Sequence, residues 1–220
     1  MLTRFSNNKI IGNIISGYDS KIVKAYCWCR FKILHQRFLE EIEQYLPKQG
    51  KVLDIGSGFG LFSLYYAQKH PELTIYGIDL DLSRTNQAKQ IAAKLSIKNV
   101  EYINADVRDF NLESNYDGVY MLDIIHHIPP DEVKELLKKI SYQLKPNSRL
   151  IIKDVDTEPA YKLWFTHILD KIMYPGTIIH YWKRSEIMQL LQDLGFKVYY
   201  HYMIDFLPYP HIMYICEKIS

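Results

Sequence analysis

The chain has 220 residues, of which 48% are hydrophobic and 24% are charged. This composition is typical of one soluble globular domain that buries a full core without disulfides or metals. The formal net charge of +2 argues against a nucleic-acid-binding surface. No stretch approaches the roughly 18 to 20 apolar residues of a membrane span, so we do not expect a spanning protein.

The cysteines and the N-terminal sequence indicate the cellular compartment. The three cysteines are Cys27, Cys29 and Cys216, an odd number, and no apolar segment of signal-peptide length lies near the N-terminus. Both features favour a reducing compartment, so we predict a cytoplasmic protein. No second Cys/His pair follows Cys27-x-Cys29, so we expect no metal.

The predicted elements begin with helices and continue as an alternation of strands and helices. Residues 1–46 are predicted to form an N-terminal helical cap, and residues 47–220 form the main domain. In chain order, we expect a strand at 51–56, a helix at 60–70, a strand at 74–81, a helix at 82–97 capped by Ser83, strands at 100–106 and 116–125, a helix at 129–144, and a turn with a fifth strand within 145–155. This alternation implies a parallel sheet with helices on both faces.

The pattern changes after residue 155. An aromatic-rich insert at about 156–184 is expected to include a helix that ends near Pro175 and Gly176 and to form a lid. An amphipathic helix at 183–196 follows, with Gly195 as its stop. Two β-rich runs, 197–205 and 211–219, predict a closing antiparallel hairpin.

The stretch VLDIGSGFG, residues 52–60, combines a strand, a glycine-rich turn and a helix start. Such a turn directs backbone N–H groups at a ligand. The spacing of Gly56, Gly58 and Gly60 is one residue shorter than the dinucleotide fingerprint. An acid at Asp54 would repel a pyrophosphate, whereas it suits the amino group in the methionine part of S-adenosylmethionine. Charge therefore favours a sulfonium cofactor over a dinucleotide.

Two further acids follow the next two predicted strands. Asp79 lies about 20 residues past the turn, where a carboxylate can bind both ribose hydroxyls. Asp106 can accept from an adenine amino group. The alternative is that the glycines serve only the turn and that both acids are solvated strand ends. Ligands of open α/β sheets bind outside the carboxyl ends of the strands, which favours one shared crevice.

Five segments in order resemble the motifs of the class I S-adenosylmethionine-dependent methyltransferases. They are VLDIGSGFG (52–60), YGIDLD (76–81), YINADVRDF (102–110), YDGVYMLDIIHHI (116–128) and LKPNSRLIIKDV (144–155). The resemblance implies an α/β, Rossmann-like fold: a seven-stranded, mostly parallel sheet with an antiparallel last strand and helices on both faces. It departs at Asn147-Ser148, where the family often has glycine, and we expect this to alter only a turn.

The resemblance also implies that S-adenosylmethionine is the cofactor. The candidate cofactor-binding residues are Asp54, Gly56, Ser57, Gly58, Gly60, Asp79, Leu80, Asp106, Val107 and Leu122.

Residues after the fourth and fifth predicted strands are candidates for the chemistry. Transfer to oxygen or carbon needs a base or a polarising partner. The candidate catalytic residues are His126, His127, Asp154 and Tyr181. Either histidine could act as a base, or both could hold a helix start.

Other polar and aromatic residues are candidates for binding the acceptor. They are Asp123, His180, Arg184, Tyr26 and Arg30. His180 and Arg184 could clamp an anionic group or orient a phenol, or their segment could simply pack on the sheet. Tyr26 and Arg30 could close the crevice, although a helical stripe of this kind is usually core.

The class of acceptor is predicted from the absence of one sequence motif and from the composition of the insert. No D/N-P-P-Y/F motif follows the fourth strand, which argues against methylation of an exocyclic base amine. The apolar insert favours a small-molecule, lipid-like or aromatic acceptor, or a transient membrane-surface contact. The chain is more loosely similar to methyltransferases of bacterial fatty-acid or aryl-polyene biosynthesis. We predict a methyltransferase; the alternatives are a catalytically silent protein of the same fold and a nicotinamide-dependent oxidoreductase.

Overall fold

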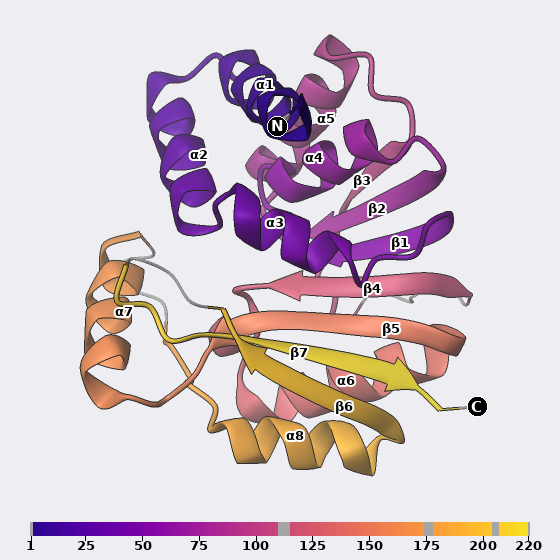
Figure 1. Ribbon diagram of the computed structural model, residues 1–220, viewed down its shortest axis with the longest axis vertical. Helices are drawn as coiled ribbons and strands as arrows, with labels where there is room; N and C mark the ends of the chain where they lie inside the picture. Colours follow the sequence, from indigo (N-terminus) through magenta and orange to yellow (C-terminus); the bar gives the residue numbers. More distant parts are fainter. Residues whose placement is uncertain (1, 110–114, 174–177, 204–206, 220) are drawn as a thin grey trace. The chain divides into compact units, whose positions relative to one another are not determined.

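The computed structural model describes residues 2–109, 115–173, 178–203 and 207–219 (Figure 1). It divides into two compact units, residues 1–110 and 111–220. Among the described residues seven strands are ordered β3-β2-β1-β4-β5-β7-β6 in one sheet. None of the described helices is long and apolar enough to cross a membrane.

The first unit contains five helices and three strands within its described part. Their bounds are α1 (Leu2–Gly17), α2 (Lys21–Ile33), α3 (Gln36–Glu43), β1 (Gly50–Ile55), α4 (Leu61–Lys69), β2 (Leu73–Asp79), α5 (Leu82–Lys94) and β3 (Val100–Asn104). β2 pairs in parallel with both β1 and β3. Because their carboxyl ends lie at one edge, the turns after these strands come together there.

Two connections in this unit explain local sequence choices. α5 begins at Leu82 because the Asp81 side chain accepts a hydrogen bond from Arg84 N at 3.0 Å. The prediction that Ser83 caps this helix is therefore wrong: the acid two residues earlier has the extended backbone of an N-cap. α4 begins after Gly60, and its buried residues include Leu64, Tyr65 and Tyr66.

The helices expected within residues 1–46 are present as α1, α2 and α3. Two buried tyrosines attach this region to the rest of the unit. The hydroxyl of Tyr18 donates to Phe59 O at 2.5 Å, and that of Tyr66 donates to Leu39 O at 3.0 Å. Burial raises the pKa of Tyr18, so its hydroxyl stays a neutral donor. The N-terminal helices thus reach the glycine-rich turn itself.

The second unit contains four strands and the remaining described helices. Their bounds are β4 (Tyr116–Leu122), the 3₁₀ turn η1 (Ile125–His127), α6 (Pro130–Gln143), β5 (Leu144–Val155), α7 (Ala160–Met173), α8 (Arg184–Asp193), β6 (Phe196–Tyr202) and β7 (His211–Lys218). β4 and β5 are parallel, whereas β7 is antiparallel to both β5 and β6. α7 stands beyond the carboxyl end of β5, at the left of Figure 1.

The predicted fold class is confirmed. The sheet is mostly parallel, and its last strand, β7, runs antiparallel as the resemblance implies.

Gly195 ends α8 with a φ of 81°, as expected for a helix stop. Asn147 has a φ of 63°, so it takes the left-handed turn conformation that glycine usually supplies. The expected helix end near Pro175 and Gly176 lies outside the described residues.

Candidate functional site

The glycine-rich turn between β1 and α4 owes its composition to its backbone. Gly56, Gly58 and Gly60 have φ angles of 77°, 53° and 76°, in a region of backbone conformation that residues with a Cβ rarely adopt. The turn is fastened to the end of β2, because Gly56 N and Ser57 N donate to Ile78 O at 2.8 and 3.0 Å. The alternate glycines therefore form a tight loop at the carboxyl edge of the strands.

Asp79, the last residue of β2, holds the turn with its carboxylate. Oδ2 accepts from Gly58 N at 2.8 Å, and Oδ1 accepts from Asp81 N at 2.9 Å. Each carboxylate oxygen has a second acceptor position, so both can also bind ligand hydroxyls. The acid predicted to bind ribose thus lies against the predicted cofactor turn.

Two features of the turn fit a polar ligand. The Ser57 hydroxyl oxygen is buried and has no hydrogen-bond partner among the described residues, which is costly unless a ligand group completes it. A Cβ built on Gly58 would meet only Asp79 Oδ2, at 3.9 Å, so there is room beside this glycine. Asp54 is 3% exposed at the base of the turn. These residues suit a cofactor with an amino group and hydroxyls.

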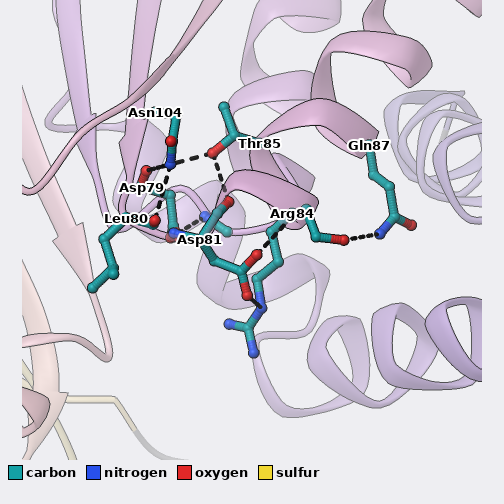
Figure 2. Close-up of polar contacts among 9 residues, drawn as sticks. Asp79, Leu80, Asp81, Arg84, Thr85, Gln87 and Asn104 are labelled. Carbon is teal, nitrogen blue, oxygen red and sulfur yellow. Dashed lines mark hydrogen bonds and ion pairs between the residues drawn. The ribbon is translucent and has the colours of Figure 1, made fainter.

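Asn104, at the end of β3, is a site residue that the sequence reasoning missed. Its amide donates to Asp79 O at 3.0 Å and to Leu80 O at 2.9 Å, which fixes the loop after β2 (Figure 2). Figure 2 also shows the exposed Leu80 side chain pointing away from these polar contacts. A polar residue closing a strand beside the predicted Asp106 was the signal that could have found Asn104.

The other predicted cofactor residues lie in different environments. The Asp106 carboxylate forms an ion pair with Arg108, whose Nε lies 2.8 Å from Oδ1. Val107 is buried beside it in the first unit. Leu122 is buried at the end of β4, in the second unit. The Arg108 partner gives the Asp106 carboxylate a salt bridge that any adenine contact would share.

Tyr26 of α2 lies against the glycine-rich turn. Its ring is 5.3 Å from that of Phe59, and the Arg84 guanidinium lies 5.4 Å from the Phe59 ring centroid. Arg30 lies over the ring of Phe62, in the first turn of α4, at 5.8 Å from the ring centroid. The structure thus brings Tyr26 next to the predicted cofactor turn, whereas Arg30 packs beside the helix that follows.

His126 and Asp154 form a buried pair in the second unit. His126 Nδ1 lies 2.5 Å from Asp154 Oδ1, and the two residues are 2% and 3% exposed. Asp154 also accepts from Ile125 N at 3.1 Å and Val155 N at 2.7 Å. The pair therefore locks η1 to the end of β5. His126 is buried, so in this structure it holds its neighbours in place and has little contact with solvent.

The other side of His126 faces the insert. Its Nε2 lies 3.8 Å from Asp170 Oδ2 of α7, and that same oxygen accepts from the Tyr181 hydroxyl at 2.8 Å. The rings of His126 and Tyr181 are stacked at 5.9 Å. Asp170 was missed by the sequence reasoning; an isolated acid in the apolar run HILDKIM was the available signal.

A second buried ion pair joins the ends of β4 and β5. Lys153 is 1% exposed and its ammonium group binds the Asp123 carboxylate. Asp123 has a φ of 57°, uncommon for a residue with a side chain, and its N–H donates to Lys153 O at 2.8 Å. Asp123 therefore contacts Lys153, so any acceptor contact would be shared with this lysine.

The remaining predicted residues lie around this network. His180 N donates to His126 O at 2.8 Å, and the rings of His126 and His127 are 4.1 Å apart. Arg184 contacts the hydroxyl of Tyr202, which donates to Asp156 Oδ2 at 2.8 Å. His180, Tyr181, His126, His127 and Asp154 are thus brought together, whereas Arg184 belongs to a separate chain of contacts on β6.

The surroundings of His126 predict how stability depends on pH. Burial alone would lower the pKa of His126, but Asp154, helped by Asp123 and Asp170, raises it above the ordinary 6.5. Since the folded pKa is the higher one, protonated His126 stabilises the fold. This contribution is fully present below about pH 6.5 and is lost as the pH rises through the folded pKa. We expect His126→Gln to remove this part of the pH dependence.

The measurement is urea unfolding of the wild type and variants in steps from about pH 6 upward. Asp154→Asn, which removes the main carboxylate partner, should flatten the same slope. Asp131→Asn is the matched control, because its side chain is 96% exposed. A slope unchanged in His126→Gln would contradict the assignment.

The chain is similar to known proteins over much of its length. Residues 29–201 match a family model described as a methyltransferase domain. Over 147 residues the chain is 32% identical to (S)-tetrahydroprotoberberine N-methyltransferase of Eschscholzia californica, covering 61% of this chain and 40% of that protein. The chain thus spans well under half the length of this relative.

Two solved structures share the fold. A SAM-dependent methyltransferase of Methanosarcina mazei superposes with a TM-score of 0.67 at 21% identity, covering 81% of this chain and 96% of that one. Geranyl diphosphate C-methyltransferase of Streptomyces coelicolor, in complex with S-adenosyl-L-homocysteine, gives 0.70 at 12% identity, covering 86% and 80%. At these identities the likeness concerns the fold alone.

Proposed function

This chain belongs to the family of class I S-adenosylmethionine-dependent methyltransferases, and from that premise we propose that it transfers a methyl group from S-adenosylmethionine to a small-molecule acceptor. The family expected from the five sequence motifs is confirmed by the family model, which spans residues 29–201. The activity and the acceptor are the proposal.

One observation supports the cofactor above all others. The Asp79 carboxylate and the glycine-rich turn are joined by the Gly58 N–H, and the buried Ser57 hydroxyl beside them has no partner among the described residues. We assign ribose hydroxyls to Asp79, the amino-acid end to Asp54 and the turn, and the adenine to Asp106. Leu80 and Val107 would flank the adenine ring.

The bound cofactor supplies an activated methyl group on a sulfonium. What remains for the protein is to orient the two reactants and to keep water out. In the first unit, Tyr26 and Phe59 cover the turn with aromatic surface. In the second, His126 and Asp154 are positioning residues for η1, and His127, Asp123 and Tyr181 are the candidates for contact with the acceptor.

The acceptor class is proposed to be a small molecule of lipid-like or aromatic character. A pocket of about 700 Å³ lies in the second unit, and its lining combines Pro130, Tyr181, Trp182 and Leu190 with the charged Lys134, Glu186 and Asp193. Such a lining suits a largely apolar molecule with a few polar groups. The relative that is 32% identical is named for N-methylation of tetrahydroprotoberberine, a small molecule.

The location and metal content are proposed from the sequence. Cys27, Cys29 and Cys216 are free thiols, which suits the reducing conditions of the cytoplasm. The proposed reaction involves no metal.

The test of the cofactor is a binding comparison. We expect isothermal titration calorimetry to detect S-adenosylhomocysteine and no NAD⁺, because the Asp54 carboxylate at the base of the turn would repel a pyrophosphate. NAD⁺ binding would favour the oxidoreductase alternative. No binding of S-adenosylhomocysteine at millimolar concentration would overturn the proposed function.

A turnover assay separates an enzyme from a silent protein of the same fold. S-Adenosylhomocysteine formation is measured with S-adenosylmethionine and a panel of apolar amines, phenols and fatty acids. Formation that depends on one acceptor class supports the enzyme. Binding without turnover on any acceptor favours the silent alternative.

A further inference from the structure

Helix α7 has its apolar side turned outward. Tyr161, Trp164 and Ile172 are 67%, 68% and 69% exposed, and Ile168 on the same face is 38% exposed. At 3.6 residues per turn these four positions form one stripe along the helix. Ile178, shortly after the helix, is also exposed. Surface helices normally bury such a stripe, so this one marks a contact surface.

Thr166 and Asp170 of α7 lie on the opposite, inner side. Thr166 is 1% exposed, and Asp170 accepts a hydrogen bond from Tyr181, which holds it toward the rest of the second unit. The helix is therefore oriented by a polar anchor on its inner side. Turning the apolar stripe inward would break the Asp170–Tyr181 hydrogen bond.

The charges of α7 suit one kind of partner. The helix has two lysines and one acid, and the acid is Asp170 on the inner side. By helical geometry Lys162 and Lys171 lie along opposite borders of the stripe, and Lys171 is exposed. If the stripe packed against the same stripe of a second copy, the lysines of the two helices would face each other, and no acid of α7 would lie between them. An anionic lipid surface complements both borders.

We propose that α7 docks on an anionic membrane surface, with the stripe Tyr161-Trp164-Ile168-Ile172 in the acyl boundary and Lys162 and Lys171 at the headgroups. Tryptophan and tyrosine favour this interface, and lysine stems reach from apolar surface to charged headgroups. The 14 residues of α7 are enough to lie in the interface plane and too few to span the membrane. The docking is independent of methyl transfer.

The test is sedimentation of the full chain with vesicles of phosphatidylcholine alone or with phosphatidylglycerol. We expect binding to the phosphatidylglycerol vesicles that falls with added salt. Trp164→Glu/Ile172→Glu should reduce it at least tenfold. Tyr161→Glu should weaken it, whereas Tyr142→Glu is the matched control, because Tyr142 is a tyrosine of similar exposure, 73%, on α6.

A second variant pair tests the charge. Lys171→Gln should weaken binding about fivefold, the effect expected from losing one cation near an anionic surface. Lys138→Gln, an exposed lysine on α6, removes the same charge and should leave binding unchanged. Circular dichroism of each variant confirms that it is folded.

Three results would overturn the proposal. One is the absence of vesicle binding by the wild type. Another is equal binding to both vesicle types, which would show that the lysines do not recognise anionic headgroups. The third is a wild-type dimer in light scattering that Trp164→Glu converts to monomer, which would assign the stripe to a second copy.

Discussion

Asp79→Ala is expected to bind S-adenosylhomocysteine about 5- to 150-fold more weakly than the wild type, a loss of about 1–3 kcal/mol. The variant removes the carboxylate that would accept the ribose hydroxyls and also releases Gly58 N, which Asp79 Oδ2 binds at 2.8 Å. Both effects act on the turn that would bind the cofactor. We therefore expect the variant to lose more affinity for S-adenosylhomocysteine than free energy of unfolding.

Titration calorimetry measures the affinity, and urea unfolding measures the stability of the same samples. Asp81→Ala is the matched control, since this neighbouring acid caps α5 through Arg84 N. It should lose about 1 kcal/mol of stability with the cofactor affinity retained. Equal affinity in Asp79→Ala and wild type would show that Asp79 is only a strand end.

Gly60→Ala is expected to destabilise the protein by about 2–5 kcal/mol. A Cβ at this position would lie 2.4 Å from Tyr102 Oη and 2.9 Å from Ala88 Cβ, and the backbone φ of 76° is itself unfavourable for alanine. The Tyr102 ring is buried, and its hydroxyl contacts Ser63 and Gly60, so it has little freedom to move.

Gly195→Ala is the control that separates strain from crowding. Its φ of 81° is similar, but nothing lies within 4 Å of an added Cβ, so only the backbone cost of about 1–2 kcal/mol remains. Urea midpoints at unchanged m-value compare the two variants. Equal losses would show that contact with Tyr102 and Ala88 does not determine the need for glycine at position 60.

Much of the fold could be read from short segments of sequence. Asp54, the alternate glycines and Asp79 each stand at or beside a strand end, and strand ends of a parallel sheet share one edge. The glycine-rich turn and its place beside Asp79 were therefore predictable from spacing alone. The residue that caps α5 was harder to predict. Asp81 and Ser83 are both good cap residues, and only the backbone geometry shows that Asp81 is the N-cap.

The sequence by itself determined the alternation of strands and helices, the glycine-rich turn and the family, because these depend on residues within a few positions of one another. Only the tertiary structure decided that His126 is held between Asp154 and Asp170, residues 28 and 44 positions away, and that Lys153 binds Asp123. It also decided that α7 turns Trp164 outward. The physical reason is that an amphipathic pattern specifies two faces of a helix, whereas the side-chain contacts of the folded protein determine which face is buried.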